Sequence, residues 1–313
     1  MSDKPNLLSS GASIAGRNKR YVVWFFVLNF VLASMGAAAF RAQVSAMLDR
    51  SLYADSLLHG FDLAVYVEML SRPEFGPMHA GTAPGMVLAG LFFVLTLIFL
   101  PGVFLGYASN YRISREDFFR ACGKNLWRFV RLAILFAIVA GIVGGILGRI
   151  ETALAKVANE NSSYEKLPFY IQLIGSTIIF LALTKIRIWF DLAEADVVIA
   201  DQRAVRKSLG KTYRQTRGNR VRLFGAYVAI SIVALLVLAI GLVIWNGVVP
   251  PASVFGALLI GQLILVLLLA TRFWQRAVAV SFYSTALAAE TPVENQPAPV
   301  SLTVAATPQA DGI

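Results

Sequence analysis

Six long apolar blocks, separated by polar connections, constrain this chain of 313 residues more than any other feature. A helix needs about 20 mostly apolar residues to cross the hydrocarbon core of a bilayer. In hydrocarbon, only helices and closed barrels satisfy their own backbone hydrogen bonds. We therefore expect an all-α polytopic membrane protein, a six-transmembrane-helix bundle with short amphipathic interfacial helices. The predicted spans lie near 21–40, 86–108, 129–148, 169–189, 223–245 and 254–274.

Composition supports a membrane as the solvent. Apolar residues make up 57% of the chain and charged residues only 15%, where about 25% charged residues is usual in soluble proteins. Outside the blocks, residues 1–16 and 287–313 lack hydrophobic periodicity. We expect a disordered cytoplasmic N-terminus, a transmembrane domain over residues 17–286 and a disordered cytoplasmic tail.

The basic residues indicate the orientation of the spans. If the N-terminus lies inside, the inner segments hold 22 Lys and Arg and the outer segments hold 6. This asymmetry predicts that both termini lie on the cytoplasmic side of a bacterial inner membrane. The first block, between Lys19 and Ala39, also resembles a cleaved signal peptide. Its length favours a retained span.

The longest outer segment, 41–85, has apolar residues at helical spacing, which predicts one or two short amphipathic helices. Both histidines, His59 and His79, fall in this segment. No spacing places two strong ligands on one element, so we predict no metal site.

The connection 201–222 is strongly basic. Val205, Leu209 and Tyr213 are spaced by four, which is typical of a helix in the membrane interface. Anionic lipid headgroups are the expected counter-charge, although the cations could instead serve only to fix topology. Nucleic acid is not expected, since stacking aromatic residues are missing there. The candidate headgroup contacts are Arg203, Arg206, Lys207, Lys211, Arg214 and Arg217.

Charges also gather at the cytoplasmic end of the fourth span. Arg187, Asp191 and Glu194 share one helix face by their spacing. Arg272 and Arg276, one turn apart at the end of the sixth span, could pair with them. Desolvated charges have to pair, so we predict a structural lock, with a gate or a site for a membrane-protein partner as the alternatives.

The third span carries small residues in two rows spaced by four. Such rows let a neighbouring helix approach closely. We therefore expect this span to be the central packing helix. The glycines of the two rows are Gly141, Gly144, Gly145 and Gly148.

The run from Trp189 to Ala193, followed by Val197 to Arg203, resembles a stretch in uncharacterised bacterial six-helix membrane proteins. In that group an aspartate–aromatic–alanine–arginine run ends the fourth span. Here Leu192 replaces the aromatic residue and Glu194 the arginine. The resemblance, with a more distant one to the membrane domain of some glycerophosphodiester phosphodiesterases, implies a bundle without catalytic residues.

No catalytic or cofactor motif is present, and the single cysteine, Cys122, excludes an intramolecular disulfide. An intramembrane enzyme would need a nucleophile–base or His–carboxylate pair, which the spans lack. We expect a non-enzymatic protein that acts through lipid contact or partner association. The alternative is a small permease or channel, which a continuous polar cavity containing Gln172, Thr177 and Gln262 would favour.

Overall fold

The structure of this protein is a computed structural model, which describes residues 6–48, 77–109, 111–161, 164, 166–218, 220–250 and 253–290. Within these ranges every long element is an α-helix and no strand occurs. The helices are α1 (Leu7–Arg17), α2 (Arg20–Leu48), α5 (Pro77–Ala108), α6 (Arg115–Asn161), α7 (Leu167–Ile199), α8 (Val205–Gly218), α9 (Arg220–Val248) and α10 (Val254–Glu290).

Six of these helices, α2, α5, α6, α7, α9 and α10, are long and apolar enough to cross a membrane. The chain is therefore an all-α, multi-pass membrane protein. Each span predicted from the sequence lies inside one of the six. The helices extend beyond the apolar blocks, because the polar connections continue them. Helix α6 is 47 residues long, whereas about 20 residues suffice to cross hydrocarbon.

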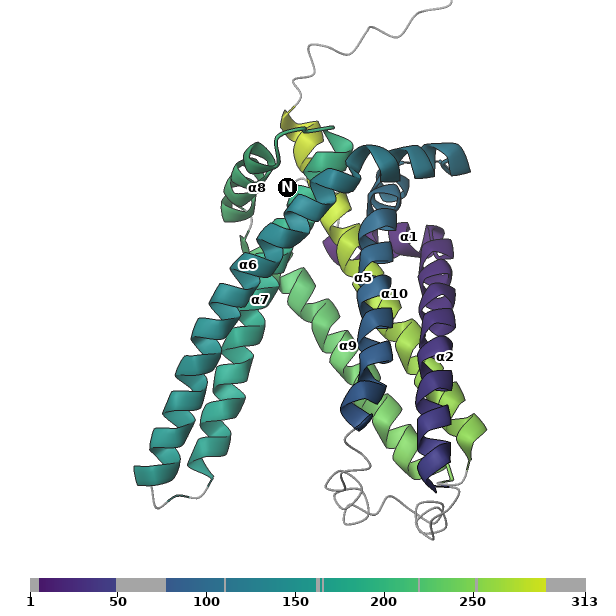
Figure 1. The fold of residues 1–313 in the computed structure, drawn as a ribbon. Coiled ribbons are helices and arrows are strands. Elements are labelled where there is room, and N and C mark those ends of the chain that lie inside the picture. The colour runs from purple at the N-terminus through teal and green to yellow at the C-terminus, as the bar shows by residue number, and fades with distance from the viewer. Residues whose placement is uncertain are drawn as a thin grey trace, which may run out of the picture.

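The six long helices form two groups that meet at one end (Figure 1). Helices α6 and α7 run side by side as an antiparallel hairpin, and α2, α5, α9 and α10 form the second group. The groups diverge toward the opposite end. We call the end where they meet the closed end; it comprises α1, α8 and the last turns of α7 and α10. Both α1 and the end of α10 lie there, as six crossings require.

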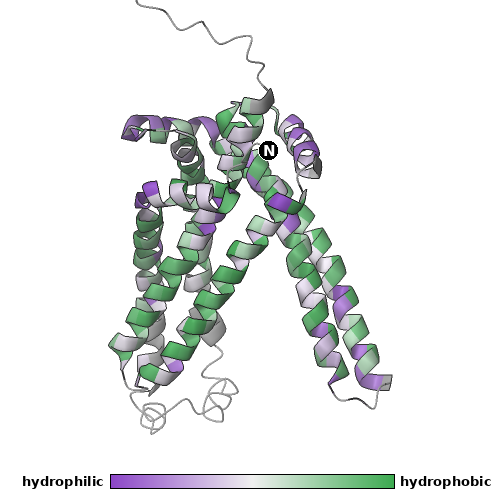
Figure 2. Cartoon of the chain, turned by 180° about the vertical axis from the view of Figure 1, so that it is seen from behind, coloured by the Kyte–Doolittle hydropathy of each residue, from purple (hydrophilic) through white to green (hydrophobic). Residues whose placement is uncertain are grey.

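The buried core lies at the closed end, because the spans come within packing distance of one another there. Away from it, the long helices carry mostly hydrophobic residues on their surfaces (Figure 2). Lipid solvates such side chains, so the divergent halves need no shared core. The largest fully buried side chains come from five spans: Tyr21, Phe104, Phe129, Tyr227 and Tyr283.

The N-terminal segment differs from the expectation of disorder, because residues 7–17 form α1. Asn6 caps this helix by accepting a hydrogen bond from the Leu8 amide at 3.1 Å. The helix packs on α10, where the Trp274 indole donates to the Leu8 carbonyl at 3.0 Å and the Ser10 and Ser281 hydroxyls lie 2.7 Å apart. Residues 287–290, also expected to be disordered, belong to α10.

The outer segment is described only in part. Residues 41–48 continue α2 and residues 77–84 begin α5. The rest of the predicted outer helices, with His59, falls on residues 49–76, outside the described residues. Among the residues that are described, no three His, Cys, Asp or Glu side chains are placed to hold a metal ion.

The prediction that the glycines of the third span mediate close packing is wrong for most of them. A methyl group on Gly141, Gly145 or Gly148 would meet no atom of the described residues within 4 Å, and on Gly144 it would make only ordinary contact with Leu183. Helix α6 lies in the outlying hairpin rather than at the centre (Figure 1). The small-residue rows do not show which face of the helix is packed, because lipid accepts the other face equally well.

Close helix packing instead depends on Gly106 of α5, which lies directly under the Tyr21 ring of α2. A β-carbon at Gly106 would lie 2.9 Å from Tyr21 Cζ, closer than van der Waals contact allows. Because Tyr21 is fully buried, it cannot move aside. Gly106→Ala is expected to lower the free energy of unfolding by about 1–3 kcal/mol, the usual cost of overpacking.

Gly145→Ala is the matched control for this prediction. It adds the same methyl group to open space and replaces a poor helix former, so stability should stay equal or rise by up to about 1 kcal/mol. Thermal unfolding of both variants in the same detergent measures the difference. Equal unfolding midpoints would contradict the close α2–α5 approach.

Candidate functional site

Four carboxylates follow one another along the last turns of α7 and the turn beyond it: Asp191, Glu194, Asp196 and Asp201. Helical geometry turns successive side chains to different sides. Because α7 ends among α6, α8, α9 and α10, the carboxylates together reach several neighbouring helices. The closed end is therefore connected through acidic groups of this single segment.

Asp191 connects α7 to α9. Its buried carboxylate accepts a hydrogen bond from the Tyr227 hydroxyl at 2.8 Å. Arg187, one turn earlier on α7, places its Nε 3.6 Å from the same oxygen, Asp191 Oδ2. The spacing of Arg187 and Asp191 thus gives the predicted pair on one helix face. The hydroxyl of Tyr227 supplies the contact to another helix.

Glu194 of α7 and Arg276 of α10 are the remaining members of the predicted charge cluster. Glu194 Oε2 and Arg276 Nε are both buried, and neither has a hydrogen-bond partner among the described residues. Among the described residues, Glu194 and Arg276 form no ion pair, so the predicted pairing between the fourth and sixth spans is not formed at Arg276.

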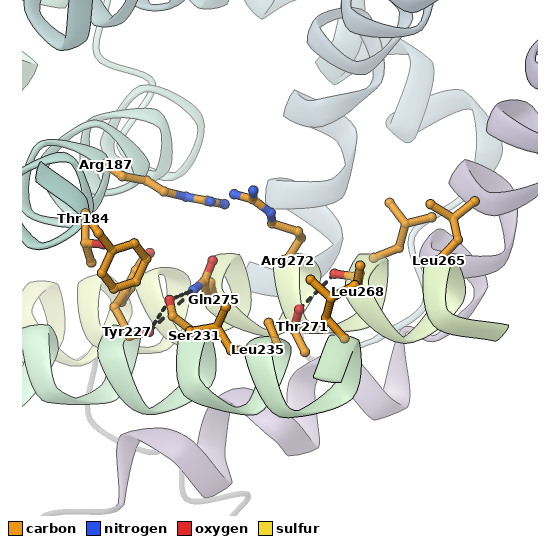
Figure 3. A pocket seen from close by; sticks show the side chains of 14 residues that line it. Thr184, Arg187, Tyr227, Ser231, Leu235, Leu265, Leu268, Thr271, Arg272 and Gln275 are labelled. Atoms are coloured by element: carbon orange, nitrogen blue, oxygen red, sulfur yellow. Dashed lines mark hydrogen bonds between the residues drawn. The ribbon is translucent and has the colours of Figure 1, made fainter. Parts of the chain in front are cut away.

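Arg272 differs from the expected lock. Within the described residues it forms no ion pair, with Asp191 or with any other carboxylate. Its side chain extends into a cavity between α7, α9 and α10 and points toward Arg187 across that space (Figure 3). Arg272 therefore does not pair with Asp191 among the described residues; Asp191 Oδ2 instead contacts Arg187 and the Tyr227 hydroxyl.

Asp196 connects α7 to both α8 and α10, and its side chain is only 1% exposed. The Tyr283 hydroxyl of α10 donates to Asp196 Oδ1 at 2.5 Å, and the Lys211 ammonium of α8 lies 3.2 Å from the same oxygen. Ser208 of α8 donates a short hydrogen bond to Oδ2. Lys211 also lies 3.2 Å from the Tyr283 hydroxyl. This network fixes α8 against the bundle.

Asp201 lies near the start of the connection from α7 to α8 and ties it to α6. Its backbone has a φ of 49°, a left-handed conformation that aspartate tolerates better than most residues. Lys124 and Arg128, one turn apart on α6, bind its two oxygens at 2.7 and 2.9 Å. Hydrogen bonds from Lys124 and then Arg128 lower the pKa of Asp201 to about 2.

Helix α8 has one face toward the bundle and one basic face toward its surroundings. Val205, Ser208 and Thr212 are buried. The Trp189 indole of α7 donates to the carbonyl of Leu209 at 2.9 Å. The apolar face that the sequence assigned to the membrane interface thus packs mainly on α7. Only Tyr213 of the predicted apolar row is largely exposed.

The predicted headgroup contacts divide into three classes. Arg203, Arg206, Lys207 and Arg214 are exposed, so the structure leaves them accessible. Lys211 points inward to Asp196 and Tyr283, which corrects its assignment to the lipid surface. The side chain of Arg217 lies outside the described residues.

The sequence did not identify the tyrosines that complete these contacts. Tyr227 and Tyr283 lie in apolar runs, where nothing in the neighbouring sequence indicates that the hydroxyl group forms a hydrogen bond. Ser208 is missed for a similar reason, because a serine on a basic helix looks like ordinary polar surface. Only the distances between helices reveal their roles. The chain matches no known protein family, no characterised protein and no solved structure.

Proposed function

We propose that this protein is a non-enzymatic component of a bacterial inner membrane that acts by holding anionic lipid headgroups against its cytoplasmic, closed end. The observation that carries the proposal is the fixed position of α8. The Asp196 network anchors the inner face of α8 to the bundle. The exposed cations of α8 are therefore carried by a helix in a fixed position rather than by a mobile loop.

The orientation rests on the distribution of charge. Segments on the same side as the closed end hold 22 of the 28 Lys and Arg residues, which is typical of cytoplasmic segments. Trp189 and Tyr213 are in edge contact beside α8, with ring centroids 5.6 Å apart. Aromatic side chains of this kind gather at the level of lipid headgroups, which supports placing α8 there.

Electrostatics gives the proposal a magnitude. A basic residue near an anionic membrane surface contributes about 1 kcal/mol, and the attraction falls off within about 10 Å. Several cations on one anchored helix add their attractions and lose little conformational freedom on binding. The exposed face of α8 should therefore enrich anionic over zwitterionic lipids around the closed end.

The test compares two triple variants of the full chain. The first, Arg206→Gln with Lys207→Gln and Arg214→Gln, removes three exposed cations from α8. The control, Arg149→Gln with Lys156→Gln and Lys166→Gln, removes three exposed cations from the far end of the α6–α7 hairpin. Native mass spectrometry counts the phosphatidylglycerol and phosphatidylcholine molecules of matched chain length that each protein retains.

We expect the unaltered protein to retain phosphatidylglycerol preferentially. The α8 variant should lose that preference by about tenfold or more, given the loss of three charges at about 1 kcal/mol each. The control should keep most of it. Equal preference in the α8 variant and the unaltered protein would overturn the proposal.

A further inference from the structure

A cavity of about 370 Å³ opens between α7, α9 and α10, and none of its lining residues belongs to α8. Its volume lies within the usual range of ligand sites, about 300–1,000 Å³. Polar side chains line one part of it and apolar side chains line the rest. The cavity is separate from the exposed cations considered above, so the inference below goes beyond the proposed function.

Two arginines from different helices face each other across the polar part. Arg187 comes from α7 and Arg272 from α10, and Figure 3 shows their guanidinium groups pointing toward one another. Asp191 offsets the charge of Arg187 at 3.6 Å, whereas Arg272 has no carboxylate partner among the described residues. The Arg187 side chain is 20% exposed, and Arg272 is exposed. Two like charges that face one another repel, and an anion between them relieves that repulsion.

A buried acceptor adds a second requirement. Gln275 is 6% exposed and donates through Nε2 to the Ser231 hydroxyl at 3.0 Å. Its Oε1 is buried and has no hydrogen-bond partner within the described residues. In Figure 3 this side chain lies beneath the two guanidinium groups. The two arginines require an anionic group, and Gln275 Oε1 requires a hydrogen-bond donor. A ligand with a hydroxyl group close to its anionic group would meet both requirements.

The lining also has a direction. On each of the three helices, a lining residue nearer the closed end is polar and one nearer the middle of the span is apolar. The pairs are Arg187 and Phe180 on α7, Tyr227 and Leu235 on α9, and Arg272 and Leu265 on α10. An inner-leaflet lipid has the same polarity, with its headgroup toward the cytoplasm and its chains toward the midplane.

We propose that this cavity binds one anionic amphiphile of the membrane, with its phosphate or carboxylate between Arg187 and Arg272 and an acyl chain along the leucines of α9 and α10. The volume accommodates a headgroup and the beginning of one chain, and the remainder of the lipid extends into the bilayer. Free phosphate shares the headgroup chemistry but not the chain, so the two sources can be distinguished.

The experiment uses the full-length protein, stripped of lipid in a neutral detergent. Native mass spectrometry follows the first lipid bound during titration with phosphatidylglycerol, and separately with phosphatidylcholine of the same chains. Arg187→Gln and Arg272→Gln are each expected to weaken the first phosphatidylglycerol site about tenfold or more, as for loss of a charged hydrogen bond. Lys185→Gln, an exposed charge on the same helix that does not line the cavity, should leave it unchanged.

A second variant keeps the charges and fills the apolar part. Leu268→Trp should weaken the phosphatidylglycerol site while inorganic phosphate, tested by thermal stabilisation, shows the same small effect as in the unaltered protein. The α8 triple variant should retain the site, which separates this inference from the proposed function. Equal binding of phosphatidylcholine, unchanged affinity in both arginine variants, or inorganic phosphate that stabilises the protein as much as the lipid would each overturn the amphiphile site.

Discussion

Replacing Asp196 with alanine is expected to lower the free energy of unfolding by about 3–5 kcal/mol, the usual cost of removing one partner of a buried ion pair. The carboxylate is 1% exposed and receives Ser208, Tyr283 and Lys211. Without it, two hydroxyls and an ammonium group lose their common acceptor. Helix α8 should then detach before the bundle unfolds.

Two measurements check this result. Limited proteolysis should cut α8 in Asp196→Ala faster than in the unaltered protein, and thermal unfolding in detergent should begin at a lower temperature. Asp196→Ala leaves the Lys211 ammonium without its carboxylate. Adding Lys211→Met removes this unpaired charge, so the double variant should regain part of the lost stability. An unchanged unfolding midpoint in Asp196→Ala would show that α8 is held by other contacts.

The same network makes a prediction about pH. Burial of the ammonium opposes its protonation, but hydrogen bonding to Tyr283 and Asp196 outweighs burial and raises the pKa of Lys211 above 10.5. The stabilisation is complete below the unfolded-state value, about 10.4, and is lost as pH rises through the higher folded value. The unaltered protein should lose more stability above this pH than Lys211→Met does.

Asp191→Ala is the second change with a large expected effect, a loss of about 2–4 kcal/mol. Tyr227 is fully buried, and its hydroxyl would lose the acceptor that lies 2.8 Å away. An unsatisfied buried donor costs about 1–3 kcal/mol, and breaking a charged pair adds to it. Arg187 can still turn toward the cavity, which limits the loss.

A pair of double-mutant cycles separates the two models of this site. Asp191→Ala combined with Tyr227→Phe should be clearly non-additive, because the two side chains are in contact. Asp191→Ala combined with Arg272→Gln should be nearly additive, within about 0.5 kcal/mol. Stronger coupling of Asp191 to Arg272 than to Tyr227 would support the ion pairing between the fourth and sixth spans that the sequence predicts, and would contradict the Asp191–Tyr227 contact.

The sequence predicts the spans because length and hydropathy are local properties. Each of the six apolar blocks lies inside one long helix. The pairing of Arg187 with Asp191 follows for the same reason, since it depends only on spacing along one helix. The basic amphipathic character of α8 is likewise local and is confirmed by its buried and exposed faces.

Contacts between helices are not local, and there the sequence is less informative. In a soluble protein an apolar face must be buried, but in a bilayer it can face lipid. The glycines of α6 therefore look like a packing surface and are not one, whereas Gly102 and Gly106 of α5, a pair with the same four-residue spacing, do pack closely against Phe118 and Tyr21. The choice of Tyr227 over Arg272 as the partner of Asp191 depends on how α9 and α10 cross α7.

The depth of α8 in the membrane tests the central claim most directly. In a Cys122→Ala background, a nitroxide on Lys207→Cys can be located by its accessibility to oxygen and to a water-soluble nickel chelate in phosphatidylglycerol-containing vesicles. A label on Glu116→Cys, at the exposed start of α6, is the comparison. Lipid contact through α8 predicts that the Lys207 label lies at the level of the phosphates and moves outward in pure phosphatidylcholine. A label in bulk water in both lipids would contradict it.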